Sequence, residues 1–305
     1  MKILVTGGAG FIGSHVADAY LAAGHEVVIV DDLSTGLYTN VPHGAKYCPL
    51  DICEHDRVTA LIRAEKPDVI NHHAAQMDVR RSVREPLYDA RVNILGTLGL
   101  IDAAQRCGVQ KFIYVSTGGA VHGQPRRQPV YEDDPIAPEC HYGVSKHTPE
   151  HYLALYRKLY GLDYTVLRYP NVYGPRQRPD GEAGVVAIFA GKMLRGEQPT
   201  IFGGGRQARD YVYVSDIARA NVAALTSGSG EIVGLGSEYS TATLTIYGEV
   251  ARATGYIGEP AHAPLRPGEI DTICLSGAKA KMRLGWEPTV SLTDGIRLTV
   301  ESLKS

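Results

Sequence analysis

Short apolar runs, separated by amphipathic stretches, recur from the N-terminus to residue 168. The first run, 1–5, stops at a glycine-rich turn, after which a helix-like spacing of apolar residues begins. Further apolar runs follow at 26–30, 45–50, 68–71, 111–116 and 164–168. Helical patterns separate most of these runs, so the sequence predicts an α/β fold with a doubly wound parallel sheet.

Beyond residue 168 the alternation gives way to glycine- and proline-rich stretches, such as 173–181 and 202–205. We therefore predict a larger domain, 1–168, to which 210–235 returns, and a smaller C-terminal domain made of 169–209 and 236–305. Doubly wound sheets bind their ligands at the carboxyl ends of the strands. The smaller domain is expected to close over that edge.

The turn after the first strand carries the first chemical signal. Gly7, Gly10 and Gly13 are spaced by three, which allows a tight turn, a close approach of backbone to phosphate, and close packing of helix on strand. The amides of the new helix N-terminus, which includes Phe11 and Ile12, then face a pyrophosphate. The turn therefore predicts a dinucleotide site of Rossmann type.

The second apolar run ends in Asp31 and Asp32, about 20 residues further on, where a carboxylate can bind a ribose diol. These acids would repel a 2′-phosphate, so NAD is favoured over NADP as the cofactor. The turn that follows belongs to the same predicted site and consists of Leu33, Ser34, Thr35 and Gly36. Other strand ends converge on this edge, and they carry Asp51, Ile52, Ala74, Ala75, Gln76, Ser116 and Thr117.

Composition and charge exclude several classes of protein. The chain has 305 residues, a formal net charge of -2 and no cluster of lysine and arginine, so neither a nucleic-acid surface nor a polybasic membrane patch is indicated. The N-terminal run stops too early for a secretory signal, and no segment approaches the roughly 18 apolar residues of a membrane span. We expect a cytoplasmic protein that binds neither nucleic acid nor membrane.

The cysteines and histidines do not indicate a metal centre. The five cysteines form no Cys-x-x-Cys pair, which argues against a disulfide framework or a zinc knuckle. Residues 147–151 fit the His-x-x-Glu-His pattern of some zinc peptidases. Such short patterns recur by chance, and the exposed side of a helix explains this one better. No metal site is predicted.

Two segments, 83–107 and 142–160, are predicted as long helices with apolar residues on more than one face. This pattern indicates either deep burial or a helical interface between subunits. We favour a homodimer formed through a helix bundle.

Tyr142 and Lys146 are four residues apart in the second of these helices, which places them on one face, one turn apart. A nearby ammonium and a positive nicotinamide favour tyrosinate and lower the pKa of the phenol. Tyr142 is therefore the candidate general base for a substrate hydroxyl. Thr117, at the end of a neighbouring strand, is the candidate hydroxyl that completes the site.

Taken together, the chain resembles the extended short-chain dehydrogenase/reductase family, and most of all its UDP-sugar 4-epimerases. The matching segments are 6–15, 31–36, 73–76, 142–146, 168–177 and 209–214. The resemblance implies that Asp51 and Ile52 flank the adenine and that Ala74, Ala75, Gln76 and Asn93 line the dinucleotide path. For the UDP-sugar it implies contacts from Asn171, Arg209 and Arg266 to the diphosphate, from Thr200 and Phe202 to the uracil, and from Glu269 to the ribose.

The resemblance also implies a reaction. Tyr142 would remove the proton of the sugar C4 hydroxyl as hydride passes from C4 to NAD; the 4-keto sugar then turns over, and hydride returns to its other face. Arginine forks suit a firmly held diphosphate, while Gly118 and Gly119 would leave room for the turning sugar. The related 4,6-dehydratases and decarboxylases need an extra acid or base near Thr117. Glycines follow Thr117 here, so neither of those reactions is expected.

Three positions depart from the family pattern. Thr117 aligns with the usual active-site hydroxyl only if the loop shifts by one residue, because direct counting places Gly118 there. His122 and His141 stand where the family commonly has tyrosine and proline. Both histidines could be structural, and His141, next to Tyr142, could instead meet an anionic substrate.

The sequence leaves the choice of sugar open. Arg178 lies in a segment that resembles UDP-glucuronate 4-epimerases, and an arginine suits a sugar carboxylate. It would also hold that carboxylate still while C4 is a ketone, which protects a β-keto acid from losing carbon dioxide. The following segment, 182–189, includes Val186 as a substrate contact and resembles epimerases of neutral UDP-sugars. UDP-glucuronate and UDP-galacturonate are slightly favoured, with UDP-glucose and UDP-galactose as the alternative.

Two other functions stay open. The same fold hosts NAD-binding regulators without activity, although the intact pair of Tyr142 and Lys146 argues against that function. A simple dehydrogenase would release NADH and change the absorbance of the solution, whereas an epimerase returns its cofactor to the starting state.

Overall fold

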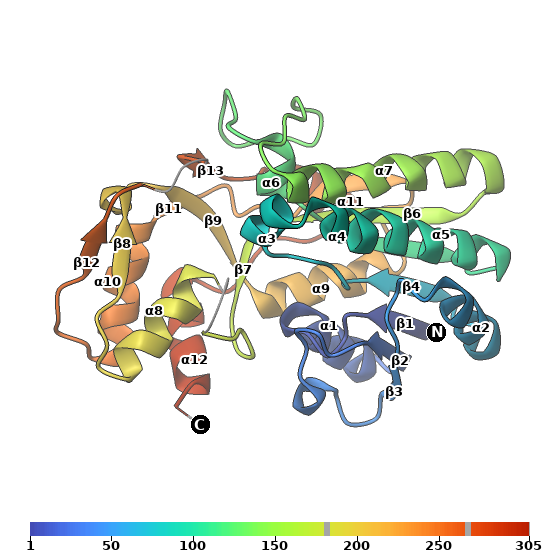
Figure 1. The fold of residues 1–305 in the computed structure, drawn as a ribbon, viewed down its shortest axis with the longest axis horizontal. Helices are drawn as coiled ribbons and strands as arrows, with labels where there is room; N and C mark the ends of the chain where they lie inside the picture. Colours follow the sequence, from blue (N-terminus) through green and yellow to red (C-terminus); the bar gives the residue numbers. More distant parts are fainter. Residues whose placement is uncertain (180–183, 266–269, 305) are drawn as a thin grey trace.

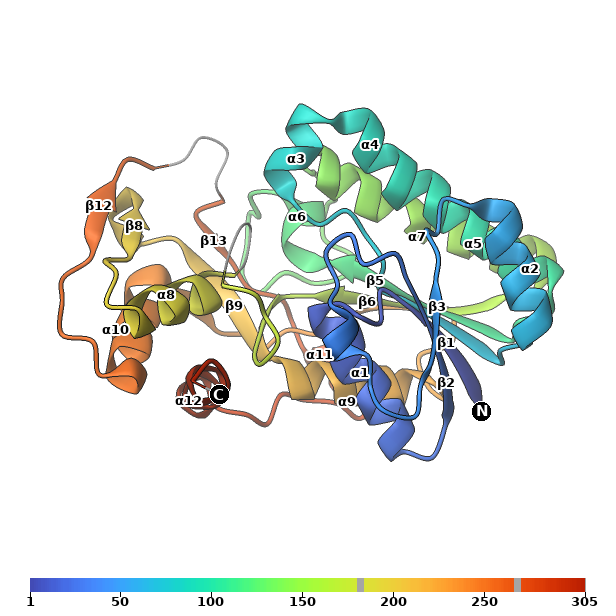
Figure 2. The same cartoon turned by 60° about the horizontal axis from the view of Figure 1, so that its bottom comes forward.

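The computed structural model describes residues 1–179, 184–265 and 270–304. Its larger part has three layers, with a sheet between two layers of helices (Figures 1 and 2). The described residues form a seven-stranded sheet in the order β10-β6-β5-β4-β1-β2-β3, and every pair in it is parallel. The strands are β1 (Lys2–Thr6), β2 (Glu26–Asp31), β3 (Lys46–Pro49), β4 (Val69–His72), β5 (Lys111–Thr117), β6 (Asp163–Tyr169) and β10 (Glu231–Gly234).

This sheet confirms the predicted doubly wound α/β fold. The strand order reverses at β1, which lies between β2 and β4. Ligands of such sheets bind at this switch point, beyond the carboxyl ends of the strands. The glycine-rich turn that follows β1 therefore lies at the expected place.

Each face of the sheet is covered by its own helices (Figure 2). One layer contains α1 (Phe11–Ala22), α9 (Val214–Ala224) and α11 (Ala278–Leu284), and the other contains α2 (His55–Glu65), α5 (Thr97–Arg106) and α7 (His141–Tyr160). Two separate apolar cores fill the spaces between sheet and helices, one on each face. Because both faces are covered, the central strands are apolar throughout rather than alternating.

The segment predicted as one helix over 83–107 is instead broken. It contains α3 (Val79–Arg84), α4 (Pro86–Ala90), the π-helical turn η2 (Arg91–Gly96) and α5. Pro86 has no backbone N–H and disfavours a helical residue before it, so α3 stops and α4 starts there. The second predicted helix, α7, is continuous and ends at Gly161, whose φ of 77 is left-handed.

The smaller part is built from short strands and three helices around a third apolar core. In the described residues β9 lies between β11 and β13 and also pairs with β7, while β8 pairs with β12. The strands are β7 (Asn171–Tyr173), β8 (Thr200–Phe202), β9 (Ala208–Tyr213), β11 (Ser240–Ala242), β12 (Ala261–Ala263) and β13 (Thr272–Ile273). The helices are α8 (Val185–Leu194), α10 (Thr243–Thr254) and α12 (Leu292–Ser302), and η3 (Gly203–Gly205) is a short turn. The larger part also contains two short elements, η1 (Tyr38–Asn40) and α6 (Gly118–His122).

The chain passes between the two parts more than once. β10 pairs with β6 in the large sheet, and α11, which lies in the range predicted for the smaller domain, packs into the core of the larger part through Ala280 and Leu284. None of the helices in the described ranges is long and apolar enough to cross a membrane.

Candidate active site

The turn between β1 and α1 leaves no room for side chains. Gly7 has a left-handed φ of 67, and a Cβ there would lie 2.6 Å from the backbone nitrogen of Ala74. A Cβ on Gly13 would overlap the carbonyl oxygen of Gly7. No side chain caps α1 within the described chain, so the amides of its first turn are available to an anion. These features fit the pyrophosphate of a dinucleotide.

The two acids after β2 have different surroundings. Asp31 is 7% exposed, and its carboxylate accepts hydrogen bonds from the backbone N–H groups of Ala9, at 2.9 Å, and Leu33, at 2.8 Å. Burial raises the pKa of this carboxyl above its ordinary value, while those two hydrogen bonds oppose the shift. Asp32 is exposed and accepts hydrogen bonds from Ser34. Asp31 is thus the acid held in a fixed position beside the glycine turn.

The other predicted cofactor residues border this edge to different degrees. Those of the turn after β2 (Leu33, Ser34 and Thr35) are exposed, Gly36 is buried against Asp31, and Phe11, Ile12, Ala74 and Ala75 are half-buried. Asp51 accepts a hydrogen bond of 2.8 Å from the N–H of Cys53, and Ile52 is buried.

Helix α7 presents Tyr142 and Lys146 one turn apart. Lys146 is 4% exposed, and its Nζ lies 4.6 Å from the ring centroid of Tyr114. Burial lowers the pKa of Lys146 to about 7, although the negative charges of Glu150 and Asp89 oppose that shift. Burial, with smaller effects of Cys140 and Asp89, raises the pKa of the Tyr142 phenol above its ordinary value.

These shifts differ from the predicted lowering of the phenol pKa. In the protein alone, the cost of burying a charge dominates, and Cys140 and Asp89 raise the pKa of Tyr142 further. The prediction also counted the positive charge of the nicotinamide. That charge would favour the ionised phenol when the cofactor is bound.

The loop after β5 carries the other predicted site residues. Thr117 is half-buried, and its hydroxyl accepts a hydrogen bond of 3.4 Å from the N–H of Ala120 at the start of α6. The Ser116 hydroxyl points elsewhere and donates to Glu150 at 2.6 Å. A Cβ on Gly118 would overlap the side chain of Leu275, whereas the nearest atom to a Cβ on Gly119 is 3.8 Å away. Of the two glycines predicted to make room for the sugar, Gly119 borders more open space, because Leu275 fills the space beside Gly118.

A buried network under α7 was not predicted from the sequence. Arg168 Nη2 lies 2.6 Å from Glu150 Oε2, and Arg168 Nη1 lies 3.0 Å from His122 Nε2. Because a guanidinium can only donate, His122 Nε2 is an acceptor and its Nδ1–H donates to the carbonyl of Pro135 at 3.2 Å. Burial, followed by the positive charge of Arg168, lowers the pKa of His122. His122 is therefore a neutral structural residue, while His141 is exposed.

A second network joins the turn after β4 to α7. Asn93 Nδ2 donates to the carbonyl of Gln76 at 2.9 Å, to Asp89 Oδ1 at 3.1 Å and to the Ser145 hydroxyl at 3.1 Å. Gln76 Nε2 donates to the same Asp89 oxygen at 2.9 Å. The sequence pattern indicates Gln76 and Asn93 but not Asp89 and Ser145, because only the folded chain brings these residues together.

The described residues predicted to bind the UDP part of the substrate lie on the smaller part. Asn171 is exposed on β7, and β7 pairs with β9, the strand that carries Arg209. Arg209 Nη1 donates to the carbonyls of Ala208 and Asp271 at 2.9 and 3.3 Å. Thr200 and Phe202, on β8, are half-buried. Arg266 and Glu269 lie outside the described residues.

Two residues selected for the sugar itself differ in exposure. Val186 is 1% exposed and packs in the apolar core of the smaller part with Phe189 and Tyr173. Its side chain therefore stabilises the fold, and the predicted substrate contact stays a prediction. Arg178 is exposed.

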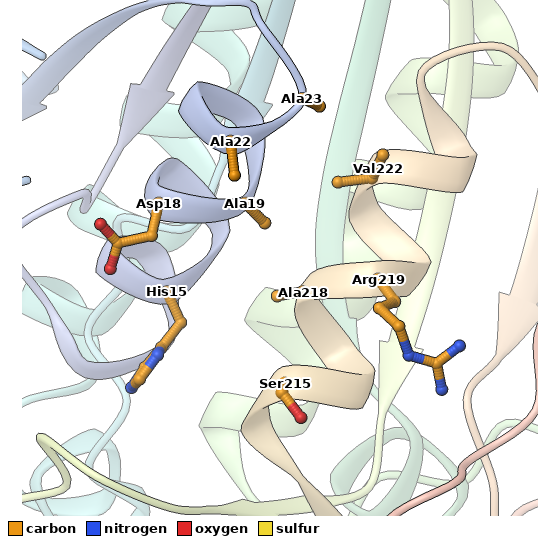
Figure 3. Close-up of a pocket in the computed structure, with 9 residues that line it drawn as sticks. All are labelled: His15, Asp18, Ala19, Ala22, Ala23, Ser215, Ala218, Arg219 and Val222. Carbon is orange, nitrogen blue, oxygen red and sulfur yellow. The ribbon is translucent and has the colours of Figure 1, made fainter. Parts of the chain in front are cut away.

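A groove between α1 and α9 lies apart from these residues (Figure 3). Its apolar lining includes Ala19, Ala22, Ala218 and Val222. None of the predicted cofactor or substrate residues lines it. Within the ranges that the structure describes, no group of three or more His, Cys, Asp or Glu residues is arranged to hold a metal ion.

Comparisons with known proteins agree with this geometry. The sequence profile of the NAD dependent epimerase/dehydratase family matches residues 3–236. The UDP-glucose 4-epimerase of Mycolicibacterium smegmatis is 44% identical over 312 residues, covering 100% of this chain and 99% of its own.

Two solved structures are also similar over nearly their whole length. The Thermotoga maritima UDP-glucose 4-epimerase with UDP-glucose has a TM-score of 0.98 and 46% identity, covering 100% of this chain and 99% of that one. The Thermus thermophilus UDP-glucose 4-epimerase in complex with NAD has a TM-score of 0.95 and 42% identity, with the same coverage. The chain therefore belongs to the NAD dependent epimerase/dehydratase family and is an NAD-dependent UDP-sugar 4-epimerase of the extended short-chain dehydrogenase/reductase type.

Proposed function

We propose that this enzyme interconverts UDP-glucose and UDP-galactose. The observation that carries this proposal is the near full-length similarity, at 42–46% identity, to proteins named for UDP-glucose, one of which is solved with that nucleotide sugar. The sequence-based preference for UDP-glucuronate is not supported by these comparisons. It rests on Arg178, an exposed side chain next to residues outside the described ranges.

We propose that Tyr142 is the general base for the C4 hydroxyl and that Lys146 stabilises its ionised form. Lys146 is buried one turn along α7 and is surrounded by groups that favour its charge, Glu150 and Asp89. Bound NAD supplies the hydride acceptor and donor at C4 and adds the positive charge that helps Tyr142 to ionise. Thr117 is proposed to orient the same hydroxyl. It is the last residue of β5, so it lies at the same edge of the sheet as the glycine turn.

The substrate is proposed to lie between the sheet edge and the smaller part. Asn171 and Arg209 would hold the diphosphate from paired strands, β7 and β9, with Thr200 and Phe202 beside the uracil. Arg266 and Glu269 keep their sequence-based roles at the diphosphate and the ribose. A firmly held diphosphate lets the 4-keto sugar turn over without leaving the enzyme.

The decisive experiment incubates the purified enzyme with UDP-glucose and, separately, with UDP-glucuronate, and follows the C4 stereochemistry by NMR. We expect UDP-galactose to accumulate to equilibrium with no net change in NADH absorbance. Epimerisation of UDP-glucuronate with none of UDP-glucose would overturn the proposed substrate and restore the role of Arg178. A net NADH signal would instead indicate a dehydrogenase.

We also infer that two copies of the chain associate through α4, η2 and α7. These elements carry exposed apolar side chains: Leu87, Leu95, Val144, Leu155 and Leu159 are between 46% and 86% exposed. Large apolar side chains gathered on one face of a protein indicate an interface.

A cytoplasmic location stays a prediction.

A further inference from the structure

Asp89 is a buried acid that a chain of hydrogen bonds through Asn93 and Ser145 joins to the helix of the proposed catalytic pair. It lies on α4 and is 1% exposed. Its Oδ1 accepts hydrogen bonds from the side-chain amides of Gln76 and Asn93, at 2.9 and 3.1 Å. A buried carboxylate is costly unless it is hydrogen-bonded or paired with a positive charge. The two amides are neutral, so they satisfy its hydrogen bonding without neutralising its charge.

The amides that bind Asp89 also fix two pieces of the proposed site. Asn93 Oδ1 accepts the backbone N–H of Gln76 at 2.9 Å, and Asn93 Nδ2 donates to the Gln76 carbonyl at 2.9 Å. Asn93 Nδ2 also reaches the Ser145 hydroxyl at 3.1 Å, and Ser145 directly precedes Lys146. The turn after β4 and helix α7 are therefore joined through one asparagine whose amide is oriented by Asp89.

The sequence of η2 permits this geometry. The π-helical turn Arg91–Gly96 contains Asn93, and a π turn re-aims side chains compared with an α-helix; such turns frequently occur at functional sites. Asp89 and Asn93 are four residues apart across the junction of α4 and η2, so they lie one turn apart. The Asn93 side-chain amide can therefore donate to a carboxylate oxygen of Asp89.

The charge of Asp89 also acts on α7. Its negative field favours the protonated forms of both Tyr142 and Lys146 and so raises both pKa values, against the lowering that burial imposes on Lys146. Lys146 also faces His72 at the end of β4 and His73 just after it, Glu150 on its own helix and the Tyr114 ring from β5. Cys140, at the N-cap of α7, faces Tyr142 and Asp89.

Burial lowers the pKa of both histidines, to about 3 for His73, so they add no positive charge near neutral pH. Glu150 is already paired with Arg168 at 2.6 Å. Two described acids act on Lys146, Glu150 and Asp89. Of these, Asp89 is hydrogen-bonded to neutral amides, whereas Glu150 is paired with a positively charged side chain.

We propose that Asp89 is a positioning residue of the epimerase: its buried carboxylate orients Asn93 and Gln76, ties the turn after β4 to α7, and places a negative charge near the turn of α7 that carries Tyr142 and Lys146. This inference rests on the proposed function of Tyr142 and Lys146. It assigns no contact between Asp89 and the substrate.

The variant Asp89→Asn tests the charge, because an amide oxygen can still accept both hydrogen bonds. Without the negative charge, Tyr142 and Lys146 lose their protons at lower pH. Both limbs of the pH profile of kcat should therefore move to lower pH, by about half a unit or more, while KM for UDP-glucose stays the same. The matched control is Asp102→Asn, which removes a carboxylate that joins α5 to Tyr156 of α7 and should leave both limbs unmoved.

The variant Ser145→Ala tests the tie between Asn93 and α7 and leaves the charge of Asp89 in place. We expect kcat to fall several-fold with unchanged KM and unmoved pH limbs. It also supplies a readout if Asp89→Asn fails to fold.

The outcomes separate this proposal from the proposed function. Wild-type enzyme that does not epimerise UDP-glucose would contradict the proposed function itself. Active wild-type enzyme whose pH profile is identical in Asp89→Asn would overturn the charge role, and an unchanged kcat in Ser145→Ala would overturn the tie.

Discussion

At the scale of single residues, burial decides how the proposed catalytic groups behave. Sequence spacing alone suggests an ammonium that lowers the pKa of a neighbouring phenol. In the structure, burial disfavours the charged form of both groups. It lowers the pKa of Lys146 to about 7 and raises that of Tyr142. The pair is therefore poised to respond to charges placed near it, including that of the oxidised cofactor.

Replacing Tyr142 by phenylalanine should remove the proposed base and leave the fold and cofactor site in place. General acid–base catalysis contributes about 10²- to 10⁴-fold, so we expect kcat to fall by roughly that factor. Turnover is measured by NMR with UDP-glucose, and bound NAD by absorbance after the protein is denatured. Turnover near the wild-type level would show that another group is the base.

The buried Glu150 should make stability depend on acid pH. Burial would raise its pKa, but hydrogen bonds from His147, Arg168 and Ser116 prevail and lower the pKa to about 2. Because the folded-state pKa lies below the ordinary value of 4.5, this stability is present above pH 4.5 and is lost as pH falls towards 2. The contribution is about 3 kcal/mol.

The variant Glu150→Gln checks that origin. It leaves Arg168 buried without its anion, which costs about 3–5 kcal/mol near neutral pH. Its free energy of unfolding, measured with urea, should also vary less than that of the wild type between pH 4.5 and 3. An equal dependence on pH in both proteins would assign the effect to other acids. Arg297→Gln, which removes an exposed ion pair with Glu301, is the control and should change stability little.

At the scale of elements, the junction of β1 and α1 shows how the backbone builds the cofactor site. Helix α1 starts directly at the glycine turn, and Gly13, inside the helix, packs against the carbonyl of Gly7. This approach brings the helix N-terminus to the switch point of the sheet. Glycine is needed there for space and not for its φ.

Gly13→Ala should therefore weaken cofactor retention and stability, because its Cβ would overlap backbone atoms that cannot move aside cheaply. We expect a loss of stability of about 1–3 kcal/mol, measured by thermal unfolding alongside the NAD content of the purified protein. Gly248→Ala on α10 is a matched control. A Cβ there meets nothing within 4 Å, so better helix propensity should stabilise it by up to ~1 kcal/mol. Equal effects of the two variants would contradict the role of Gly13.

At the scale of the whole molecule, contacts between sequence-distant residues join the two parts, and two of them involve α1. The His15 Nε2 on α1 lies 2.9 Å from the carbonyl of Pro175, and Arg176 pairs with Asp18 at 2.7 Å. The segment after β7 is thus fastened to the first helix of the large part. The face formed by α4, η2 and α7 lies on the other side of the sheet from α1 (Figure 2), so association there leaves these connections untouched.

Charges on that face should separate the proposed dimer into monomers. We expect the double variant Leu155→Glu and Leu159→Glu to sediment as a monomer, because burying two carboxylates without partners is unfavourable. Leu244→Glu, which changes a leucine that is 51% exposed on α10, is the control and should sediment as the wild type does. A monomeric wild type would end the dimer proposal.

The sequence by itself determined the parallel sheet, the glycine turn and the Tyr142–Lys146 spacing, because local periodicity and short motifs encode them. It missed the break at Pro86 within a segment expected to be one helix, and it did not indicate that the side chain of Val186 fills a core. Only the tertiary structure decided that Leu275 fills the space beside Gly118 and that Asp89 and Glu150 both act on Lys146. Burial and charge near the pair depend on side chains contributed by distant segments, which spacing along the chain does not encode.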